Sequence, residues 1–321
     1  MPTTLDLTRF GLGMAALGRP AYITLGHAGD FPQGRDVDSM ELHAQGVLDH
    51  ARSAGIRYFD AARSYGRAER FLRGWIDSRR IKPGEIVVGS KWGYRYTGDW
   101  QVDGRVQEVK DHGVAMLEKQ FAESEAILGP YLRLYQIHSA APETRVLEKR
   151  DVLDELGRLR ERGFSLGVTV TGTRQLETIR RAMEIRVDGV PLFSTMQATF
   201  NLLERTAGPA LREAHDAGFT VLVKEALANG RLGPKGTEQK TAALRRVAEG
   251  LAASVDAVAI AFVLQQPWAD VVLSGATTAA QLDSNLRALD VNLGRADLEA
   301  LEPLRTPAEE YWAERAKLPW N

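Results

Sequence analysis

Four side chains that could together move a proton onto a carbonyl oxygen stand at or just beyond the ends of apolar runs. Asp60, Lys91 and His138 each end such a run, and Tyr65 follows shortly after Asp60. A phenol can donate a proton, an ammonium can favour the phenolate, a carboxylate can hold the ammonium, and an imidazole can hydrogen-bond the reacting oxygen. This set predicts general acid catalysis on a carbonyl group, or the reverse reaction on an alcohol.

These residues lie where buried strands are expected to end. Short runs of β-branched and aromatic residues recur along the chain, and segments with helical spacing separate them, which is typical of parallel strands. Side chains at the carboxyl ends of parallel strands converge on one mouth of a barrel, so we expect the four residues to meet there. The expected strands cover residues 10–14, 56–60, 86–91, 134–138, 165–170, 194–199, 219–224 and 271–274.

Helical patterns fill the intervals between these strands. Helices are expected over residues 38–54, 69–78, 109–128 and 146–162. A fifth helix is expected to begin near residue 174 and a sixth to end at 218. One or two helices are expected over 242–266, and a last one from near 279. A long loop, 92–104, follows the third strand, and the residues after Pro303 are too polar for another core strand. The alternation has no linker, so the sequence predicts one (β/α)₈ TIM barrel, a single domain over residues 1–321.

Composition narrows the class of protein. Hydrophobic residues make up 44% of the chain, and 41 Lys plus Arg balance 42 Asp plus Glu, which indicates a globular protein without a nucleic-acid partner. Cysteine is absent, which excludes disulfides and thiolate chemistry, and the histidines have no metal-ligand spacing, so no metal is expected. No signal peptide or membrane-spanning stretch is evident, so we expect a soluble, cytoplasmic protein; the sequence leaves its oligomeric state open.

One glycine-rich segment imitates a dinucleotide-binding motif. Residues 11–16 read Gly-Leu-Gly-Met-Ala-Ala, which satisfies the pattern G-x-G-x-x-A. That motif requires a helix to begin at once, so that its N-terminus meets the pyrophosphate. A loop containing Gly18 and Pro20 follows instead, so we reject a Rossmann domain and interpret the glycines as a site of close approach by backbone or ligand.

The chain resembles the aldo-keto reductase family over nearly its whole length. The type, order and spacing of Asp60, Tyr65, Lys91 and His138 match that family's catalytic residues. Residues 196–205 resemble its sixth-strand segment, and residues 275–278 with Gln281 and Asn285 resemble the segment that holds the adenosine end of NADP(H). The resemblance implies a barrel that binds an extended nicotinamide cofactor and transfers hydride to an aldehyde or ketone without a metal.

The resemblance also implies a role for each residue. Tyr65 would be the general acid, Lys91 would lower its pKa, Asp60 would orient Lys91, and His138 would hydrogen-bond the substrate oxygen. The cofactor-binding residues implied by the family positions are Thr169, Gln197, Ser274, Gly275, Thr277, Gln281 and Asn285.

Two positions depart from the family pattern. The Ser-Asn pair that usually contacts the carboxamide is replaced by Thr169 and Val170, and valine offers no polar group. The basic pair that usually grips the 2′-phosphate is replaced by residues such as Thr277 and Gln281. NADP(H) is therefore the first expectation, and NAD(H) is the alternative.

The substrate pocket is expected to be aromatic, with walls from the loop after the third strand and from the tail. Such a wall suits a small-molecule carbonyl or sugar substrate. Two other functions remain open: a cofactor-sensing subunit resembling channel-associated β subunits, and a lyase or aldolase that forms an imine at Lys91. The expected pocket residues are Trp92, Trp100, His112 and Trp312, with Tyr94, Tyr311 and Trp320 nearby.

Overall fold

The computed structural model describes residues 8–103 and 106–321. Eight parallel strands close into a barrel in the order β1-β12-β11-β10-β7-β6-β3-β2, which confirms the predicted fold class. The neighbours β1 and β2 are in register from Gly11 opposite Tyr58 to Gly13 opposite Asp60. The barrel strands are β1 (Phe10–Gly13), β2 (Tyr58–Asp60), β3 (Val87–Trp92), β6 (Leu132–Ala140), β7 (Ser165–Val170), β10 (Thr195–Thr199), β11 (Thr220–Lys224) and β12 (Val271–Ser274).

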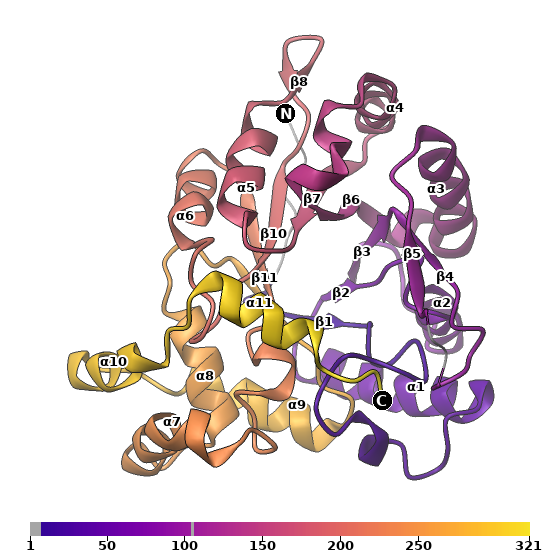
Figure 1. Cartoon of the computed structure of the whole chain (residues 1–321). Helices are drawn as coiled ribbons and strands as arrows, with labels where there is room; N and C mark the ends of the chain where they lie inside the picture. Colours follow the sequence, from indigo (N-terminus) through magenta and orange to yellow (C-terminus); the bar gives the residue numbers. More distant parts are fainter. Residues whose placement is uncertain (1–7, 104–105) are drawn as a thin grey trace.

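Helices surround the barrel and bury their apolar sides against it (Figure 1). Within the described residues no single helix is long and apolar enough to cross a membrane; residues 241–250 and 255–264 pass that test only as a pair, bent by 90°. The helices are α1 (Val37–Ser53), α2 (Ala68–Ser78), α3 (Val114–Leu128), α4 (Arg150–Glu161), α5 (Gln175–Glu184), α6 (Gly208–Asp216), α7 (Glu238–Gly250), α8 (Val255–Leu264), α9 (Ala279–Leu286), α10 (Arg295–Leu301) and α11 (Ala308–Ala316).

A small second core fills the inside of the barrel, separate from the core between the strands and helices. Its largest member is Tyr58, which is fully buried. Two glycines make room for this ring: a Cβ on Gly89 would lie 2.3 Å from the Tyr58 hydroxyl, and one on Gly11 would lie 2.7 Å from its ring. Gly11 of the first strand therefore serves barrel packing, and a loop rather than a helix follows that strand. Leu134, Leu222, Val271 and Leu273 complete this inner core.

The structure corrects the expected elements around the third strand. Strands β4 (Tyr94–Tyr96) and β5 (Glu108–Lys110) form an antiparallel hairpin, so the helix predicted from residue 109 begins only at α3. The N-cap of α3 is Gly113, in extended conformation, which separates hairpin from helix. A second short hairpin, β8 (Arg186–Val187) and β9 (Val190–Pro191), was also not predicted.

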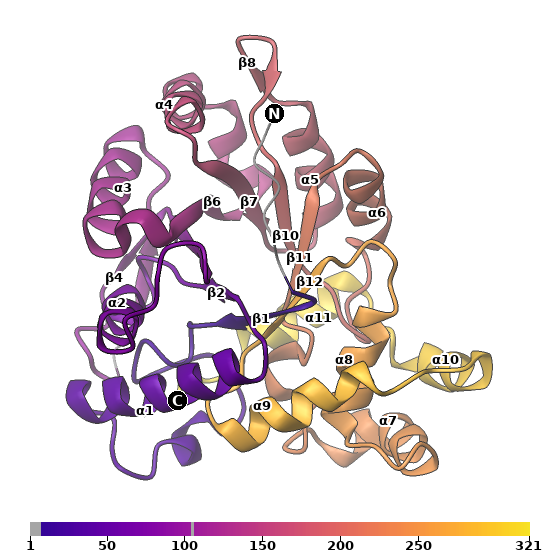
Figure 2. The ribbon, with the colours of Figure 1, turned by 180° about the vertical axis from the view of Figure 1, so that it is seen from behind.

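The C-terminal tail crosses one end of the barrel. Helix α11 lies in front of β1 and β11 in Figure 1 and behind the strands in the reverse view of Figure 2. The chain end then pairs with the loop after β1: the backbone groups of Asn321 and Tyr22 exchange two hydrogen bonds of 3.2 Å. The Asn321 side-chain amide also donates to the carbonyl oxygen of Thr24 at 2.8 Å. The tail thus covers the mouth without adding a core strand.

Candidate active site

The structure brings the four predicted catalytic residues together at the mouth of the barrel. Asp60 ends β2, Lys91 lies in β3, His138 lies in β6, and Tyr65 sits on the turn between β2 and α2. The Lys91 ammonium donates to the Asp60 carboxylate and, at 2.9 Å, to the carbonyl oxygen of Ala61. The Tyr65 hydroxyl lies 3.4 Å from Nε2 of His138, and Nζ of Lys91 lies 4.9 Å from the centre of the Tyr65 ring.

Asp60 is the centre of a larger hydrogen-bond network than the sequence indicated. Its Oδ2 accepts from the Tyr58 hydroxyl at 2.9 Å, from the Gln197 amide at 2.9 Å and from the Gln136 amide at 3.4 Å. Tyr58 and Gln136 each stand two positions before a predicted catalytic residue on the same strand. The two-residue period of a strand, which puts such positions on one face, was the signal that could have identified them.

His138 is held as a neutral ring. Burial lowers the pKa of its imidazole well below the ordinary 6.5, and the nearby charge of Lys91 lowers it further. The Ser64 hydroxyl lies 3.4 Å from Nδ1, and when it donates there the neutral ring keeps its proton on Nε2, facing Tyr65. His138 can therefore donate a hydrogen bond to a substrate oxygen.

The pKa of the Tyr65 phenol is raised in this structure, so the net lowering expected from the sequence is not seen. Burial raises the pKa of the Tyr65 phenol well above 10.0, and the Asp60 carboxylate raises it further. The side chain that opposes this rise is Arg19, whose guanidinium charge lowers the pKa of Tyr65. Lys91 is tightly paired with Asp60, and this pairing weakens the field of the ammonium at the phenol.

A cavity of about 570 Å³ runs from Tyr65 and His138 to the start of α9. Within the described residues, Thr169 does not line this cavity. Its hydroxyl accepts a hydrogen bond from the Ser139 backbone amide at 2.7 Å. Ser139 and Thr171, which the sequence did not indicate, line the cavity in its place. The other predicted cofactor-binding residues, Gln197, Ser274, Gly275, Thr277, Gln281 and Asn285, all line the cavity.

At the far end of the cavity, the polar side chains form hydrogen bonds with one another. The Thr277 hydroxyl lies 2.9 Å from the Gln281 side-chain oxygen and 2.7 Å from Oδ2 of Asp30, a residue of the loop after β1. Lys235, from the loop after β11, reaches across to the other Asp30 oxygen at 3.4 Å. A carboxylate therefore stands beside the threonine predicted to bind the 2′-phosphate.

The cavity offers acceptor atoms that fit a nucleotide. Oδ1 of Asn229 and Oδ1 of Asp256 are buried and have no hydrogen-bond partner within the described residues. Both residues line the cavity. Buried polar atoms normally have partners, so these oxygens suit a ligand that brings hydroxyl or amino donors, as ribose and adenine do. The volume of the cavity and its unpaired acceptors therefore suit a nucleotide-containing ligand.

The predicted substrate-pocket residues lie elsewhere. Within the described residues, none of Trp92, Trp100, His112 and Trp312 lines the main cavity. Trp92 is fully buried and packs edge-on against His112, whose Nε2 donates to the carbonyl oxygen of His138 at 2.9 Å. Their residue types and positions in the sequence did not indicate that Trp92 and His112 pack under His138 instead of lining the cavity. Trp312 packs edge-on against Tyr311.

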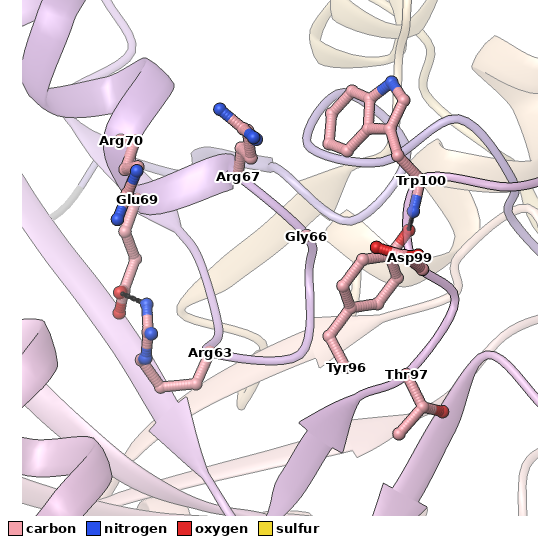
Figure 3. A pocket seen from close by; sticks show the side chains of 9 residues that line it. All are labelled: Arg63, Gly66, Arg67, Glu69, Arg70, Tyr96, Thr97, Asp99 and Trp100. Carbon is pink, nitrogen blue, oxygen red and sulfur yellow. Dashed lines mark hydrogen bonds and ion pairs between the residues drawn. The ribbon is translucent and has the colours of Figure 1, made fainter. Parts of the chain in front are cut away.

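Trp100 lines a separate pocket of about 380 Å³ on the outer side of the Tyr65 turn. Figure 3 shows this pocket, in which Arg67 lies 5.7 Å from the centre of the Trp100 indole and Arg63 pairs with Glu69. The aromatic rings that do line the main cavity belong to Tyr22, Tyr65 and Trp320.

Comparisons with known proteins give the family to which this barrel and its site belong. The model of the Aldo/keto reductase family matches residues 23–305, so the chain belongs to the aldo-keto reductase family. It is 24% identical to the uncharacterized oxidoreductase YqkF of Bacillus subtilis, covering 97% of each chain. It is 26% identical to pyridoxal 4-dehydrogenase of Microbacterium luteolum, covering 74% of this chain and 72% of the relative.

Solved structures support the same fold. The holo form of an aldo-keto reductase from Bacillus halodurans matches with a TM-score of 0.70 at 18% identity, over 95% of this chain and 94% of that one. A putative aldo-keto reductase from Pseudomonas aeruginosa matches with a TM-score of 0.64 at 23% identity, over 89% of this chain and 92% of that one. These structures share the barrel fold of this chain, and the family match makes the chain an oxidoreductase.

Proposed function

We propose that the protein reduces an aldehyde or ketone to an alcohol with a nicotinamide cofactor, or catalyses the reverse oxidation. The observation that supports this most is the pairing of the Tyr65 hydroxyl and the His138 imidazole, 3.4 Å apart, in a cavity of about 570 Å³. Both groups can contact one substrate oxygen. A small-molecule carbonyl compound is the expected partner.

The side chains divide the work as follows. Gln197, Ser274 and Asn285 would hold a nicotinamide cofactor, which when bound would supply the hydride in reduction and accept it in oxidation. Tyr65 donates its phenolic proton to the carbonyl oxygen, and His138 holds that oxygen through its Nε2–H. Lys91 and Asp60 form an ion pair behind Tyr65. The Tyr58 hydroxyl and the Gln197 amide donate hydrogen bonds to the Asp60 carboxylate and keep it in place.

Replacing the phenol tests this assignment. We expect Tyr65→Phe to lower kcat by ~100-fold or more while leaving cofactor affinity within about a factor of two, because a positioned acid is worth at least that much. Cofactor oxidation at 340 nm with a reactive aldehyde gives kcat, and fluorescence titration gives the affinity. Tyr131→Phe is the matched control, since its buried hydroxyl donates to the carbonyl oxygen of Ile81. A Tyr65→Phe enzyme that keeps more than about a tenth of the activity contradicts the role.

We further propose that NAD(H) binds more tightly than NADP(H), which reverses the order expected from the sequence. Asp30 offsets the charge of Lys235 and stands beside Thr277, so this end of the cavity has no net positive charge for a 2′-phosphate, whereas the Asp30 carboxylate can accept hydrogen bonds from the ribose hydroxyls of NAD(H). Fluorescence titration should give a Kd ratio of ~10 in favour of NADH, and Asp30→Asn should reduce that ratio toward one. Tighter NADPH binding to the wild type would contradict this order.

Two other functions are less well supported. A cofactor-sensing subunit would bind the cofactor but show almost no turnover in the same aldehyde assay. An imine-forming lyase would need an accessible Lys91 amine. Its side chain is 1% exposed, paired with Asp60 and absent from the cavity lining within the described residues. Borohydride in the presence of a carbonyl compound is therefore expected to leave Lys91 unmodified.

A further inference from the structure

Arg19 occupies an unusual place beside the catalytic phenol. It is 2% exposed and lines the main cavity. Its guanidinium carbon lies 5.1 Å from the centre of the Tyr65 ring, 5.2 Å from that of Tyr22 and 4.8 Å from that of Trp320. A buried arginine surrounded by three rings has lost most of its rotamer freedom, so its charge and donors are held in a fixed position.

One side of the guanidinium is fully anchored. Nε donates to the carbonyl oxygen of Ala15 at 3.2 Å, and Nη1 donates to the carbonyl oxygen of Ser64 at 3.1 Å and to the Glu108 carboxylate at 2.9 Å. No hydrogen bond from Nη2 is found in residues 8–103 and 106–321, and Nη2 is not among the buried atoms that lack a partner, so it keeps some accessible surface. Arg19 thus brings unused donors to the cavity next to Tyr65.

The backbone keeps Arg19 and Tyr65 at a constant separation. Gly18 packs so closely that a Cβ on it would lie 2.4 Å from the carbonyl oxygen of Tyr65. Gly66 has a φ of +58°, and a Cβ on it would lie 2.4 Å from the carbonyl oxygen of Gly18. The Arg67 backbone amide donates to that same oxygen at 2.7 Å. The loop after β1 and the catalytic turn therefore act as one rigid unit.

The charge of this site favours a neutral oxygen over an anion. Glu108 already neutralises Arg19 through their ion pair, and it also lines the cavity. A substrate carboxylate at Nη2 would lie close to the Glu108 carboxylate and be repelled, whereas a hydroxyl oxygen would gain a charge-assisted hydrogen bond without that cost.

We propose that Arg19 is a specificity-determining residue that donates from Nη2 to a hydroxyl oxygen on the carbon next to the reacting carbonyl. The preferred substrates are then neutral hydroxy-aldehydes and hydroxy-ketones. This inference rests on the proposed carbonyl chemistry, and it adds a contact that the catalytic residues do not provide. A site built to hydrogen-bond a substrate hydroxyl discriminates against the analogue that lacks it.

The first test compares two aldehydes that differ by one hydroxyl. We expect the wild type to have a higher kcat/KM for 2-hydroxypropanal than for propanal, and Arg19→Gln to lower this ratio by ~10-fold or more. Arg205→Gln is the matched control: Arg205 packs over Phe262 and pairs with Glu302, outside the cavity lining. An unchanged ratio in Arg19→Gln, or no preference in the wild type, overturns the proposal. A wild type that reduces neither aldehyde instead contradicts the carbonyl chemistry itself.

The second test keeps Arg19 and removes its counter-charge, so it does not depend on the folding of Arg19→Gln. In Glu108→Gln the guanidinium is no longer neutralised, and kcat/KM for glyoxylate relative to glycolaldehyde should rise by ~10-fold. An unchanged relative kcat/KM would show that substrate oxygens do not meet Arg19, and the proposal would then be wrong.

Discussion

At the scale of single residues, Asp60 holds the site together. Its carboxylate accepts from Lys91, Tyr58 and Gln197, and all of these groups are buried. A buried carboxylate is stable only when its lone pairs are satisfied and its charge is matched. Asp60 therefore sets the position of the ammonium behind the Tyr65 phenol, the proposed general acid, and Gln197 has a structural role as well as a place in the cavity wall.

This network predicts an order of severity for two substitutions. Lys91→Met should lower kcat by ~100-fold or more, because it leaves the Asp60 charge uncompensated beside the Tyr65 phenol, and that charge raises the pKa of the phenol. Asp60→Asn should lower kcat less, by ~10-fold, because the amide can still accept from Lys91 and no longer carries the charge that raises the pKa of Tyr65. Steady-state rates from pH 5 to 10 measure both effects. Superimposable pH–rate profiles for the wild type and Lys91→Met would contradict this explanation.

At the scale of elements, the loop between β1 and α1 determines the shape of the mouth. It carries Tyr22 and Arg19 into the cavity and includes a short 3₁₀ helix, η1 (His27–Asp30). His27 is fully buried between the rings of Tyr22 and Phe31, and neither ring nitrogen has a hydrogen-bond partner within the described residues. Burial lowers the pKa of His27 to about 4.

The buried histidine should make the fold sensitive to acid. Because its folded pKa of about 4 lies below the ordinary 6.5, the unfolded chain binds the proton more readily. The stability that neutral His27 contributes is therefore present above pH 6.5 and lost as the pH falls toward 4, by up to about 3 kcal/mol. His27→Leu should show a smaller loss of unfolding free energy between pH 7 and 4.5 in urea titrations. An equal loss in both proteins would contradict the assignment.

At the scale of the whole molecule, closure of the barrel depends on the space that glycines leave for Tyr58. A Cβ at Gly89 would lie 2.3 Å from the Tyr58 hydroxyl, so the ring would have to move and release its hydrogen bond to Asp60. Barrel packing and the active site therefore share one side chain.

Gly89→Ala should consequently destabilise the fold by about 2 kcal/mol or more and lower activity at the same time. The matched control is Gly46→Ala in α1, where a Cβ would meet nothing within 4 Å, and where a gain of up to about 1 kcal/mol is expected because alanine favours a helix. Urea unfolding monitored by circular dichroism compares the variants. A Gly89→Ala protein as stable as the wild type would show that Tyr58 does not constrain closure.

Several features could be predicted from the sequence by itself. The alternation of apolar runs with helical segments predicted the barrel fold, because hydrophobic periodicity can be recognised locally along the chain. The positions of Asp60, Lys91 and His138 at strand ends predicted that their side chains would meet, because parallel strands in a barrel direct their carboxyl ends to one mouth. These conclusions needed only spacing and residue type.

Other features depend on contacts between residues distant in sequence, and only the tertiary structure decided them. The approach of Asp30 to Thr277, the seating of Arg19 against Trp320, and the burial of Trp92 behind the site join segments that no local pattern relates. Loops carry little periodicity, so neither the hairpin after β3 nor the lining of the cavity follows from spacing. The tertiary structure decided which charges meet, and thereby the pKa of Tyr65 and the proposed preferences for cofactor and substrate.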